Sequence, residues 1–270
     1  MTHPDIHTLI QLVHETRPLI TETENAKNVT VKGYADFVTM VDTSVQEFLK
    51  EKLFKIAPHV QFMGEENHMD QIDPKKPSWI LDPIDGTTNL IFDYHHSAVS
   101  LAYYDGNRIQ MGVVYNPFSG ETFYASRGQG AFLDEKPIRV TKHSSLDQSL
   151  ISIGTSPYDR ELARENFRIF LEVFQKSLDI RRSGSAALDL AYVACGRLDG
   201  FFEKNLKPWD FAAGSVILEE AGGQITNDMG QPLNFCKNQN IVSSNGLIHE
   251  KLLECLCPLD GQSKNTEVDK

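Results

Sequence analysis

The stretch Asp82-Pro83-Ile84-Asp85-Gly86-Thr87-Thr88-Asn89 follows the apolar run Trp79-Ile80-Leu81. The run is short and apolar, as expected of a β-strand, and a strand that ends in Asp-x-x-Asp-Gly-Thr can direct both carboxylates into one pocket. Gly86 permits a tight turn of the backbone, and Thr87 and Thr88 can cap a helical turn that follows. Carboxylates next to backbone amides suit a hard cation beside an anion. The stretch therefore predicts metal-dependent chemistry on a phosphate.

Two further segments offer carboxylates of the same kind. Gly64-Glu65-Glu66 follows a short apolar run and places acids at a strand end, where either glutamate could point inward. Trp209-Asp210-Phe211-Ala212-Ala213-Gly214 supplies another aspartate, before small residues that permit a closely packed helix. Asp210 can equally serve as a plain helix N-cap. We predict that these acids join the first pair in one site.

A site built from four acids requires cations. The predicted metal-binding carboxylates are Glu65, Asp82, Asp85 and Asp210. Two like charges ~4 Å apart repel by about 4 kcal/mol at an effective dielectric of 20, so the four cannot all stay ionised without cations or raised pKa values. Oxygen ligands without His or Cys favour Mg²⁺ over Zn²⁺, with Mn²⁺ as a possible substitute. With a phosphate dianion the charge is about −6, which predicts two or three divalent ions.

In this order and at these distances, the three segments resemble the inositol monophosphatase family of metal-dependent sugar-phosphate phosphatases. The resemblance extends from about Lys32 to Gly246. It implies a bacterial-type member with layered helices and sheets, an active site between two halves of the chain, and a homodimer. It also implies that the Ile84 carbonyl is an additional metal ligand, and it selects Glu65 over Glu66.

Hydrophobic patterning divides the chain into two parts. Turn clusters separate apolar runs over 97–125, which predicts an antiparallel sheet, whereas strand and helix patterns alternate after about 145. With the resemblance, we expect a mixed α/β (α+β) fold, a layered αβαβα sandwich in a single phosphatase domain, 1–270. Its antiparallel half spans about 1–145, its alternating half about 146–257, and a polar tail about 258–270. A helix is expected over 161–176, with an apolar stripe of Leu162, Phe167, Phe170, Leu171 and Phe174.

Catalytic roles follow from the hydroxyl in the first stretch and from the resemblance. A bound metal ion lowers the pKa of its water and supplies a nucleophile, which Thr87 can orient. In the family, an aspartate equivalent to Asp42 hydrogen-bonds this threonine, and Asp42 can also be a helix N-cap. Glu65 is counted with Thr87 and Asp42 as catalytic. The Gly86 and Thr87 amides are expected to hold the phosphate. The role of Lys32 stays open, because it lies about one residue from the family's lysine.

Substrate contacts are expected in the second part of the chain. Gly184-Ser185-Ala186 and Glu203 match positions that contact the polyol in the family, and Glu203 would accept hydrogen bonds from vicinal hydroxyls. Alternatively, Glu203 is a surface charge paired with Lys204 or Lys207. Thr155 is either a substrate neighbour or a plain loop residue. A second phosphate has four candidate cations nearby: Arg181, Arg182, Lys204 and Lys207.

Composition excludes several other classes of protein. The 270 residues carry a formal net charge of −11, and 40% of them are hydrophobic. An acidic surface disfavours nucleic-acid binding, which requires cations. The N-terminal residues lack the pattern of a signal peptide, and no apolar run is long enough to span a membrane, so a cytoplasmic protein is expected.

These observations predict a Mg²⁺-dependent phosphomonoesterase that hydrolyses inositol monophosphate or a similar sugar phosphate by in-line attack of metal-activated water. Fructose 1,6-bisphosphate or NADP remain alternative substrates on the same fold. An alternative of another class is a catalytically idle binding or regulatory protein. The complete acidic set with Thr87 disfavours it, because an idle site has no reason to retain the repulsion.

Overall fold

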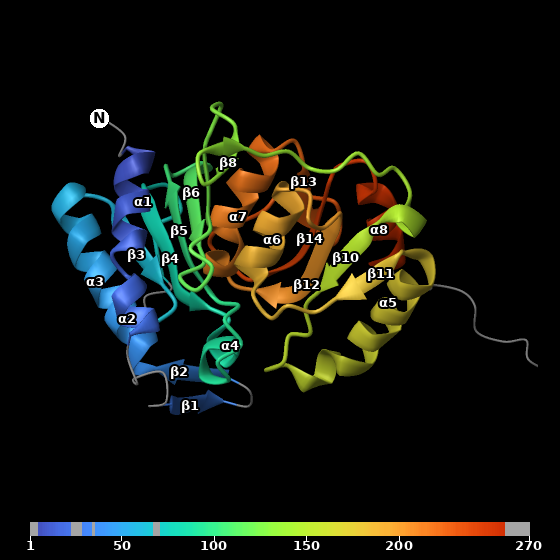
Figure 1. Ribbon diagram of the computed structural model, residues 1–270, viewed down its shortest axis with the longest axis horizontal. Helices are drawn as coiled ribbons and strands as arrows, with labels where there is room; N and C mark the ends of the chain where they lie inside the picture. The colour runs from blue at the N-terminus through green and yellow to red at the C-terminus, as the bar shows by residue number, and fades with distance from the viewer. Residues whose placement is uncertain (1–4, 23–28, 34–35, 67–70, 257–270) are drawn as a thin grey trace, which may run out of the picture.

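Five layers of helices and sheets make up the computed structural model, which describes residues 5–22, 29–33, 36–66 and 71–256 (Figure 1). The first outer layer contains α1 (Ile6–His14), α2 (Arg17–Thr21) and α3 (Met40–Ile56). A central helical layer between the two large sheets contains α6 (Ala186–Ala194) and α7 (Pro208–Glu220). The other outer layer contains α5 (Ala163–Lys176) and α8 (His249–Leu256). The order is therefore αβαβα, and the predicted fold class is confirmed.

The first large sheet runs in chain order and is almost entirely antiparallel. Its strands are β3 (Gln61–Gly64), β4 (Ser78–Asp85), β5 (Ala98–Tyr104), β6 (Ile109–Tyr115), β7 (Thr122–Ser126), β8 (Ala131–Leu133) and β9 (Lys136–Pro137). The β3–β4 pair is parallel, and each later neighbour is antiparallel to the one before. Short turns between the strands account for this pattern, because antiparallel neighbours need no long crossover.

The second large sheet has crossovers, as the alternating pattern predicts. Its strands are β10 (Leu150–Ile153), β11 (Asp179–Arg181), β12 (Gly200–Leu206), β13 (Gln224–Asn227) and β14 (Gln239–Ser244), in the spatial order β11-β10-β12-β14-β13. Strand β10 is parallel to both of its neighbours. A small antiparallel pair, β1 (Val29–Gly33) and β2 (Asp36–Thr39), precedes α3, and the short helix α4 (Thr87–Ile91) follows β4. Short 3-10 helices span Leu146–Gln148 and Arg160–Leu162.

Three apolar cores lie between the five layers. Trp79 and Leu81 point from β4 toward α1 and α3, whereas Ile80 points the other way, toward α6 and α7. This alternation is the period of a strand buried on both faces. The third core joins β10, β12 and β14 to α5 and α8. Helix α7 packs on β5 and β6 although it follows β12 in the chain, so the two halves share one core. The division near residue 145 stays a prediction.

The apolar stripe predicted for the helix over 161–176 is wrong in part. Phe167, Leu171 and Phe174 are 67%, 57% and 53% exposed. The buried face of α5 is the one that carries Asn166, Ile169, Phe170 and Val173. Both sets repeat at helical spacing, so periodicity alone could not decide between them. Among the described residues, no helix is both long and apolar enough to cross a membrane. Residues 257–270, which include the predicted tail, lie outside the described part.

Candidate active site

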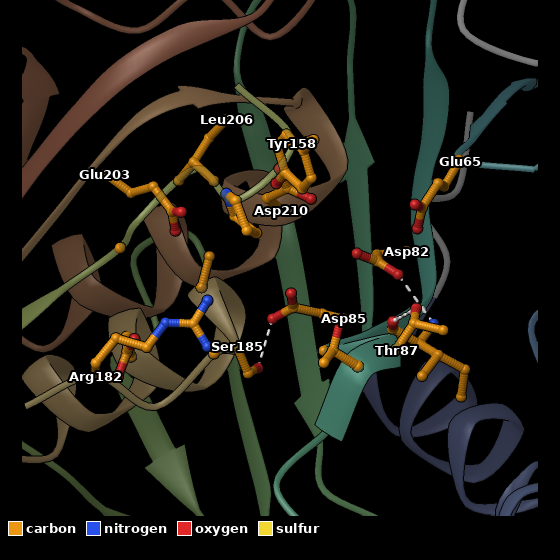
Figure 2. Close-up of a pocket in the computed structure, with 18 of the residues that line it drawn as sticks. Glu65, Asp82, Asp85, Thr87, Tyr158, Arg182, Ser185, Glu203, Leu206 and Asp210 are labelled. Carbon is orange, nitrogen blue, oxygen red and sulfur yellow. Dashed lines mark hydrogen bonds between the residues drawn. The ribbon is translucent and has the colours of Figure 1, made fainter. Parts of the chain in front are cut away.

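A pocket between the two large sheets collects the predicted site residues from both halves of the chain (Figure 2). All but Asp42 line it: Glu65, Asp82, Ile84, Asp85, Gly86, Thr87, Gly184, Ser185, Ala186, Glu203 and Asp210. The first half contributes the ends of β3 and β4 and the start of α4. The second half contributes the start of α6, the end of β12 and the start of α7. Residues more than 100 positions apart in the sequence therefore face one cavity.

Three aspartates converge at the centre of this pocket. One carboxylate oxygen from each of Asp82, Asp85 and Asp210 lies within 4.8 Å of the others, and all three residues are buried. In a regular strand, residues three apart point to opposite faces. The pairing of β4 with β5 is irregular between Asp82 and Asp85, and such a bulge redirects a side chain. This irregularity explains how one strand end can supply two carboxylates to one cavity.

Burial and crowding both act on these acids. The pKa of Asp82 is raised well above its ordinary value, first by burial and then by repulsion from Glu65, Asp85 and Asp210. Burial also raises the pKa of Asp210, and repulsion from Asp85 and Glu65 adds to it. Burial raises the pKa of Asp85 to about 6, and hydrogen bonds from the start of α6 oppose this rise. Full ionisation of the cluster would therefore put more negative charge in the pocket than its protein neighbours neutralise.

Glu65, rather than Glu66, lines the pocket. The amide of Glu65 continues the β3–β4 ladder by donating to the Leu81 carbonyl at 3.3 Å. The main chain of Glu66 is held instead by Gln46 of α3. In Figure 2 the carboxylates of Glu65 and Asp82 lie close to each other. The strand end thus presents the acid that the family resemblance selects.

Asp210 lies in the first turn of α7, three residues after the N-cap Lys207, so its interpretation as the N-cap itself is wrong. Its carboxylate accepts a hydrogen bond from the Lys207 amide at 2.7 Å, which caps the helix. Its side chain also lies with Asp82 and Asp85 in the acidic cluster. Pro208 occupies the first turn, where a missing amide donor costs nothing. Capping therefore orients Asp210 and does not withdraw it from the pocket.

Thr87 makes the hydrogen bond that the family resemblance implies. Its Oγ1 lies 2.9 Å from Asp42 Oδ1 and 3.1 Å from the Ile84 carbonyl, so its single proton has two acceptors. Asp42 also forms a capping box at the start of α3, where Oδ2 accepts from the amide of Thr39 at 2.9 Å and from its hydroxyl at 2.5 Å. Burial raises the pKa of Asp42 although these bonds oppose the change. Asp42 is therefore the third residue of α3, with Thr39 as its N-cap, so the interpretation of Asp42 as the N-cap itself is wrong, whereas its bond to Thr87 is present.

The start of α6 contacts the acidic cluster directly. Asp85 Oδ2 accepts from Ser185 Oγ at 2.5 Å and from the Ala187 amide at 2.7 Å. Ser185, predicted to contact substrate, thus presents its hydroxyl to Asp85. Gly86 and Gly184 have positive φ angles of 92° and 91°, and a Cβ on Gly86 would lie 3.1 Å from the Gly184 carbonyl oxygen. Two glycines therefore let the halves meet at the pocket floor.

Glu203 is buried on the opposite wall of the pocket. Its Oε1 accepts a hydrogen bond from the Ser156 amide at 2.9 Å, and a Cβ on Gly154 would lie only 1.9 Å from its Cδ. Burial raises the pKa of Glu203 to about 7. Lys204 pairs instead with Glu165 at 2.7 Å, so the interpretation of Glu203 as a paired surface charge is wrong. A second bulge, between Glu203 and Leu206, lies at this end of β12.

One of the four cations considered for a second phosphate lines this pocket. Arg182 does so, and its Nη2 donates to Thr155 Oγ1 at 3.1 Å. Arg181 pairs with Asp179 at 2.5 Å, outside the pocket lining. Lys32 belongs to β1, but its side chain lies outside the part of the chain that the structure describes.

The geometry can now be compared with known proteins. A model of the inositol monophosphatase family matches residues 2–260 of this chain. The chain belongs to the inositol monophosphatase family. It is 40% identical to Inositol-1-monophosphatase of Caulobacter vibrioides over 231 residues, which are 84% of this chain and 90% of that protein. It is also 37% identical to Nus factor SuhB of Escherichia coli K12 over 254 residues, 93% of this chain and 95% of that protein.

Solved structures agree with this membership. The extragenic suppressor protein suhB of Bartonella henselae matches with a TM-score of 0.85 and 35% identity, over 93% of this chain and 97% of that chain. Two structures of SaIMPase-II match with a TM-score of 0.79 and 30% identity, over 92% of this chain and 91% of theirs. One is bound to inositol monophosphate and the other to 2'AMP.

In this member of the inositol monophosphatase family, two titratable pocket residues were not predicted by the sequence analysis. Tyr158 is 45% exposed as a residue, yet burial of its hydroxyl and the nearby Asp210 and Glu203 raise its pKa. Asp189 lies on α6 and accepts from Ser183 Oγ at 2.7 Å, and burial raises its pKa to about 8. Asp189 follows Ser185 by four residues, so helical spacing could have placed both on one face. For Tyr158, which lies in a loop, no comparable signal exists.

Proposed function

We propose that this protein is a Mg²⁺-dependent phosphomonoesterase that hydrolyses inositol monophosphate or a similar sugar phosphate. The observation that carries the proposal is the convergence of Asp82, Asp85 and Asp210 within 4.8 Å, beside a threonine bonded to a buried aspartate. Family membership supports a phosphatase. The SaIMPase-II complexes support a phosphorylated small molecule as the ligand class.

The donor set suits divalent cations. Glu65, Asp82, Asp85 and Asp210, with the Ile84 carbonyl, would hold the metal, and all of them offer oxygen, which Mg²⁺ prefers. The raised pKa values of Asp82 and Asp210 support this fit, because burial and then repulsion between the carboxylates cause them, and a bound cation would offset both. When bound, Mg²⁺ supplies charge neutralisation for the phosphate and lowers the pKa of water at the site.

Thr87 would position the attacking water. Its proton is directed to Asp42 or to the Ile84 carbonyl, so the lone pairs of its oxygen remain able to accept a hydrogen from water. The buried Asp42 carboxylate fixes the orientation of the Thr87 hydroxyl, because Thr39 holds the second oxygen of Asp42 in place. A water that donates to Thr87 keeps the lone pairs of its own oxygen free for attack. The hydroxyl thereby contributes orientation, which is a large part of the cost of a hydrolytic step.

The two walls of the pocket would receive different parts of the substrate. The Gly86 and Thr87 amides lie at the start of α4, where donors suit phosphate oxygens. Gly184, Ser185, Ala186 and the Glu203 carboxylate form the wall that would contact the polyol. Because Ser156 donates to one oxygen of Glu203, its other oxygen is available for substrate hydroxyls.

Phosphate release from a substrate panel tests this function. The panel contains inositol 1-phosphate, fructose 1,6-bisphosphate, NADP, 2'-AMP and p-nitrophenyl phosphate, each with Mg²⁺ and with EDTA. We expect the highest kcat/KM for inositol 1-phosphate, with turnover lost in EDTA. If Zn²⁺ alone sustained full turnover of the metal-stripped protein, the magnesium assignment would be wrong.

A second candidate function is hydrolysis of a bisphosphate or a nucleotide phosphate. Arg182 favours it, because its guanidinium lines the pocket and could pair with a second anion. Fructose 1,6-bisphosphate or NADP would then exceed inositol 1-phosphate in kcat/KM. Some relatives carry the name Nus factor, and release of no phosphate from any substrate would favour a binding or regulatory role. We also propose a homodimer, on the family resemblance alone, and sedimentation measures it; the cytoplasmic location stays a prediction.

A further inference from the structure

Helix α3 carries two polar side chains on a face that is otherwise apolar. Asp42 and Gln46 are both 0% exposed, among buried neighbours that include Val45 and Leu49. Residues four apart lie one above the other on a helix, so the two side chains point in the same direction. Asp42 reaches Thr87, which follows β4. Gln46 reaches the segment that follows β3.

Gln46 binds this segment with both ends of its amide. Its Nε2 donates to the Glu66 carbonyl at 2.9 Å, and its Oε1 accepts from the Glu66 amide at 3.0 Å. The side chain therefore pairs with one residue's backbone as a neighbouring strand would. Gly64 makes room for it, since a Cβ there would lie 2.4 Å from Gln46 Oε1. Gln46 thus holds the main chain of Glu66, directly after Glu65, and packs against Gly64, directly before it.

We propose that Gln46 is a positioning residue that fixes Glu65 for metal binding. The inference rests on the proposed function, because it takes Glu65 as a metal ligand. Gln46 is absent from the pocket lining, so it acts through the backbone of its neighbours. Its amide is neutral and adds no charge to the cluster. Outer partners of this kind orient ligands, and their loss weakens metal affinity by about 10- to 100-fold.

The two polar residues of α3 then have separate tasks. Asp42 orients the Thr87 hydroxyl, which would position the water, and Gln46 positions the Glu65 carboxylate, which would bind the cation. Loss of Gln46 should therefore be compensated by a higher Mg²⁺ concentration, whereas loss of the Asp42–Thr87 bond should not. If Gln46 only helped α3 to pack on β3, its loss would lower the melting temperature, and a higher Mg²⁺ concentration would not restore turnover.

The test uses Gln46→Met, which keeps the length of the side chain but removes both hydrogen bonds. Mn²⁺ binding to metal-stripped protein is measured by electron paramagnetic resonance, and turnover of p-nitrophenyl phosphate is followed against Mg²⁺. Leu49→Ala is the matched control, because Leu49 is also 0% exposed on α3 and lies in the apolar core. Gly64→Ala is the second variant, since its methyl group would displace the same amide from the other side.

We expect Gln46→Met to bind Mn²⁺ about 10- to 100-fold more weakly, with kcat at saturating Mg²⁺ within about 3-fold of the wild type. Gly64→Ala should behave similarly, and Leu49→Ala should melt earlier but bind Mn²⁺ normally. The inference is overturned if Gln46→Met binds Mn²⁺ no more weakly than Leu49→Ala. Failure of the proposed function looks different: the wild type would bind Mn²⁺ yet release no phosphate, and the Gln46 comparison would still be measured.

Discussion

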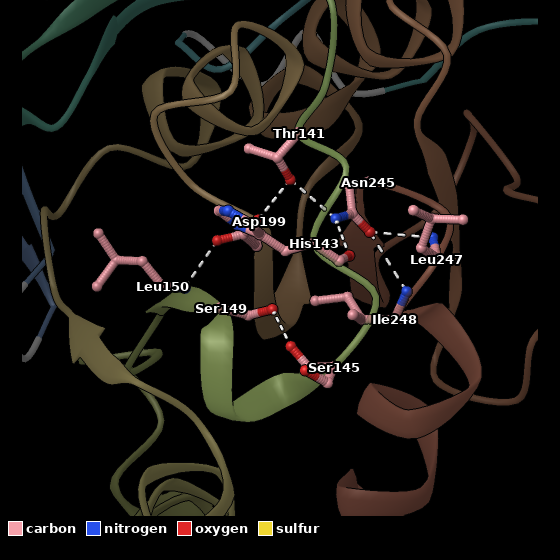
Figure 3. A network of polar contacts seen from close by, with 9 residues as sticks. All are labelled: Thr141, His143, Ser145, Ser149, Leu150, Asp199, Asn245, Leu247 and Ile248. Atoms are coloured by element: carbon pink, nitrogen blue, oxygen red, sulfur yellow. Dashed lines mark hydrogen bonds and ion pairs between the residues drawn. The ribbon is translucent and has the colours of Figure 1, made fainter.

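Two groups of buried acids in this protein differ in how their charge is balanced. Asp199 lies in a polar network where β12 begins (Figure 3). Its oxygens accept hydrogen bonds from the Leu150 amide at 2.8 Å, from Thr141 Oγ1, and from His143 Nδ1 at 2.9 Å. Asn245 extends the network by donating to Thr141 Oγ1 at 2.8 Å. All of these donors belong to the protein, so Asp199 has a structural role: it links the segments that contain them.

The acids of the pocket have a different environment. Asp82 and Asp210 lie next to other carboxylates, and their raised pKa values record burial with repulsion. The comparison shows that burial of a carboxylate does not by itself mark a functional site. What distinguishes the pocket is that its acids face one another, where a ligand of positive charge is needed.

The largest expected effect is the loss of turnover when an acid of the pocket is neutralised. Asp85→Asn and Asp210→Asn each remove one negative charge at nearly constant shape, and should lower kcat at least about 100-fold, because even outer partners of a metal site cost that much. Without metal, both variants should melt at or above the wild-type temperature, since repulsion is relieved. Phosphate release and calorimetric melting measure the two effects. Unchanged turnover would remove the mutated residue from the site.

Asp199→Asn is the matched variant in the other group. The new amide keeps one acceptor oxygen but places its NH2 group against either the Leu150 amide or the donors of Thr141 and His143, so about 1–3 kcal/mol of unfolding free energy should be lost. Its kcat should stay near the wild-type value. A 100-fold loss of turnover in a fully folded Asp199→Asn would erase the contrast between the groups.

Two threonines, each bonded to a buried aspartate, give the next largest contrast. Thr87→Ala removes the hydroxyl that would orient water, so kcat should fall about 100-fold for every substrate while metal affinity is kept. Thr141→Ala breaks an equivalent bond to Asp199 and should cost about 1 kcal/mol of stability with little change in kcat. Steady-state kinetics with denaturant unfolding compare them. Equal kinetic losses in both variants would contradict the assignment of Thr87.

A smaller effect is expected on the substrate wall. Glu203→Gln should raise KM for inositol 1-phosphate about 10-fold, as the loss of one charged hydrogen bond implies, but should spare p-nitrophenyl phosphate. Gly154→Ala should act in the same direction, because its methyl group would collide with Glu203. For a bisphosphate, Glu203→Gln could lower KM by removing a repelling charge. If Glu203→Gln lowers kcat/KM equally for inositol 1-phosphate, p-nitrophenyl phosphate and the bisphosphate, the proposed role of Glu203 in substrate selection is wrong.

A further expected effect is on stability as a function of pH. In the metal-free protein the pKa values of Asp85, Glu203 and Asp189 are raised to about 6, 7 and 8. The folded state thus binds more protons than the unfolded state between pH ~4 and 8, so stability falls as pH rises through this range. Glu203→Gln and Asp189→Asn should flatten this slope, and for Glu203 the difference in stability between pH 5 and pH 8 should shrink by up to about 3 kcal/mol. Urea unfolding at pH 5 and pH 8 measures it; a slope unchanged in both variants would contradict the account.

The sequence predicted those parts of the site that depend on local chemistry. Asp82 and Asp85 follow an apolar strand, and Asp210 opens a helix of small residues, so each motif was visible within a few positions. Family resemblance added the bond between Thr87 and Asp42, which joins residues 45 positions apart. Sequence could not show that Ser185 would face Asp85, because that contact depends on how α6 meets β4.

Other features could not be predicted because they depend on tertiary packing. Helix α5 has two apolar stripes one position apart, and only its packing on the second sheet decides that Ile169 and Val173 are buried while Phe167 is exposed. Gln46 carries no motif, and its role depends on the place where β3 ends. Local pattern therefore predicted the elements and the acids, whereas the supporting contacts required the fold.

Mg²⁺ titration of the melting temperature tests the central claim most directly, in metal-stripped wild type, Asp210→Asn and Asp199→Asn. The wild-type melting temperature should rise with Mg²⁺, because a ligand that binds the folded state stabilises it. Asp210→Asn should start at or above the wild-type value and lose most of the response, whereas Asp199→Asn should start lower and keep it. The claim would be contradicted if Mg²⁺ left the wild type unchanged, or if Asp210→Asn responded as strongly as the wild type.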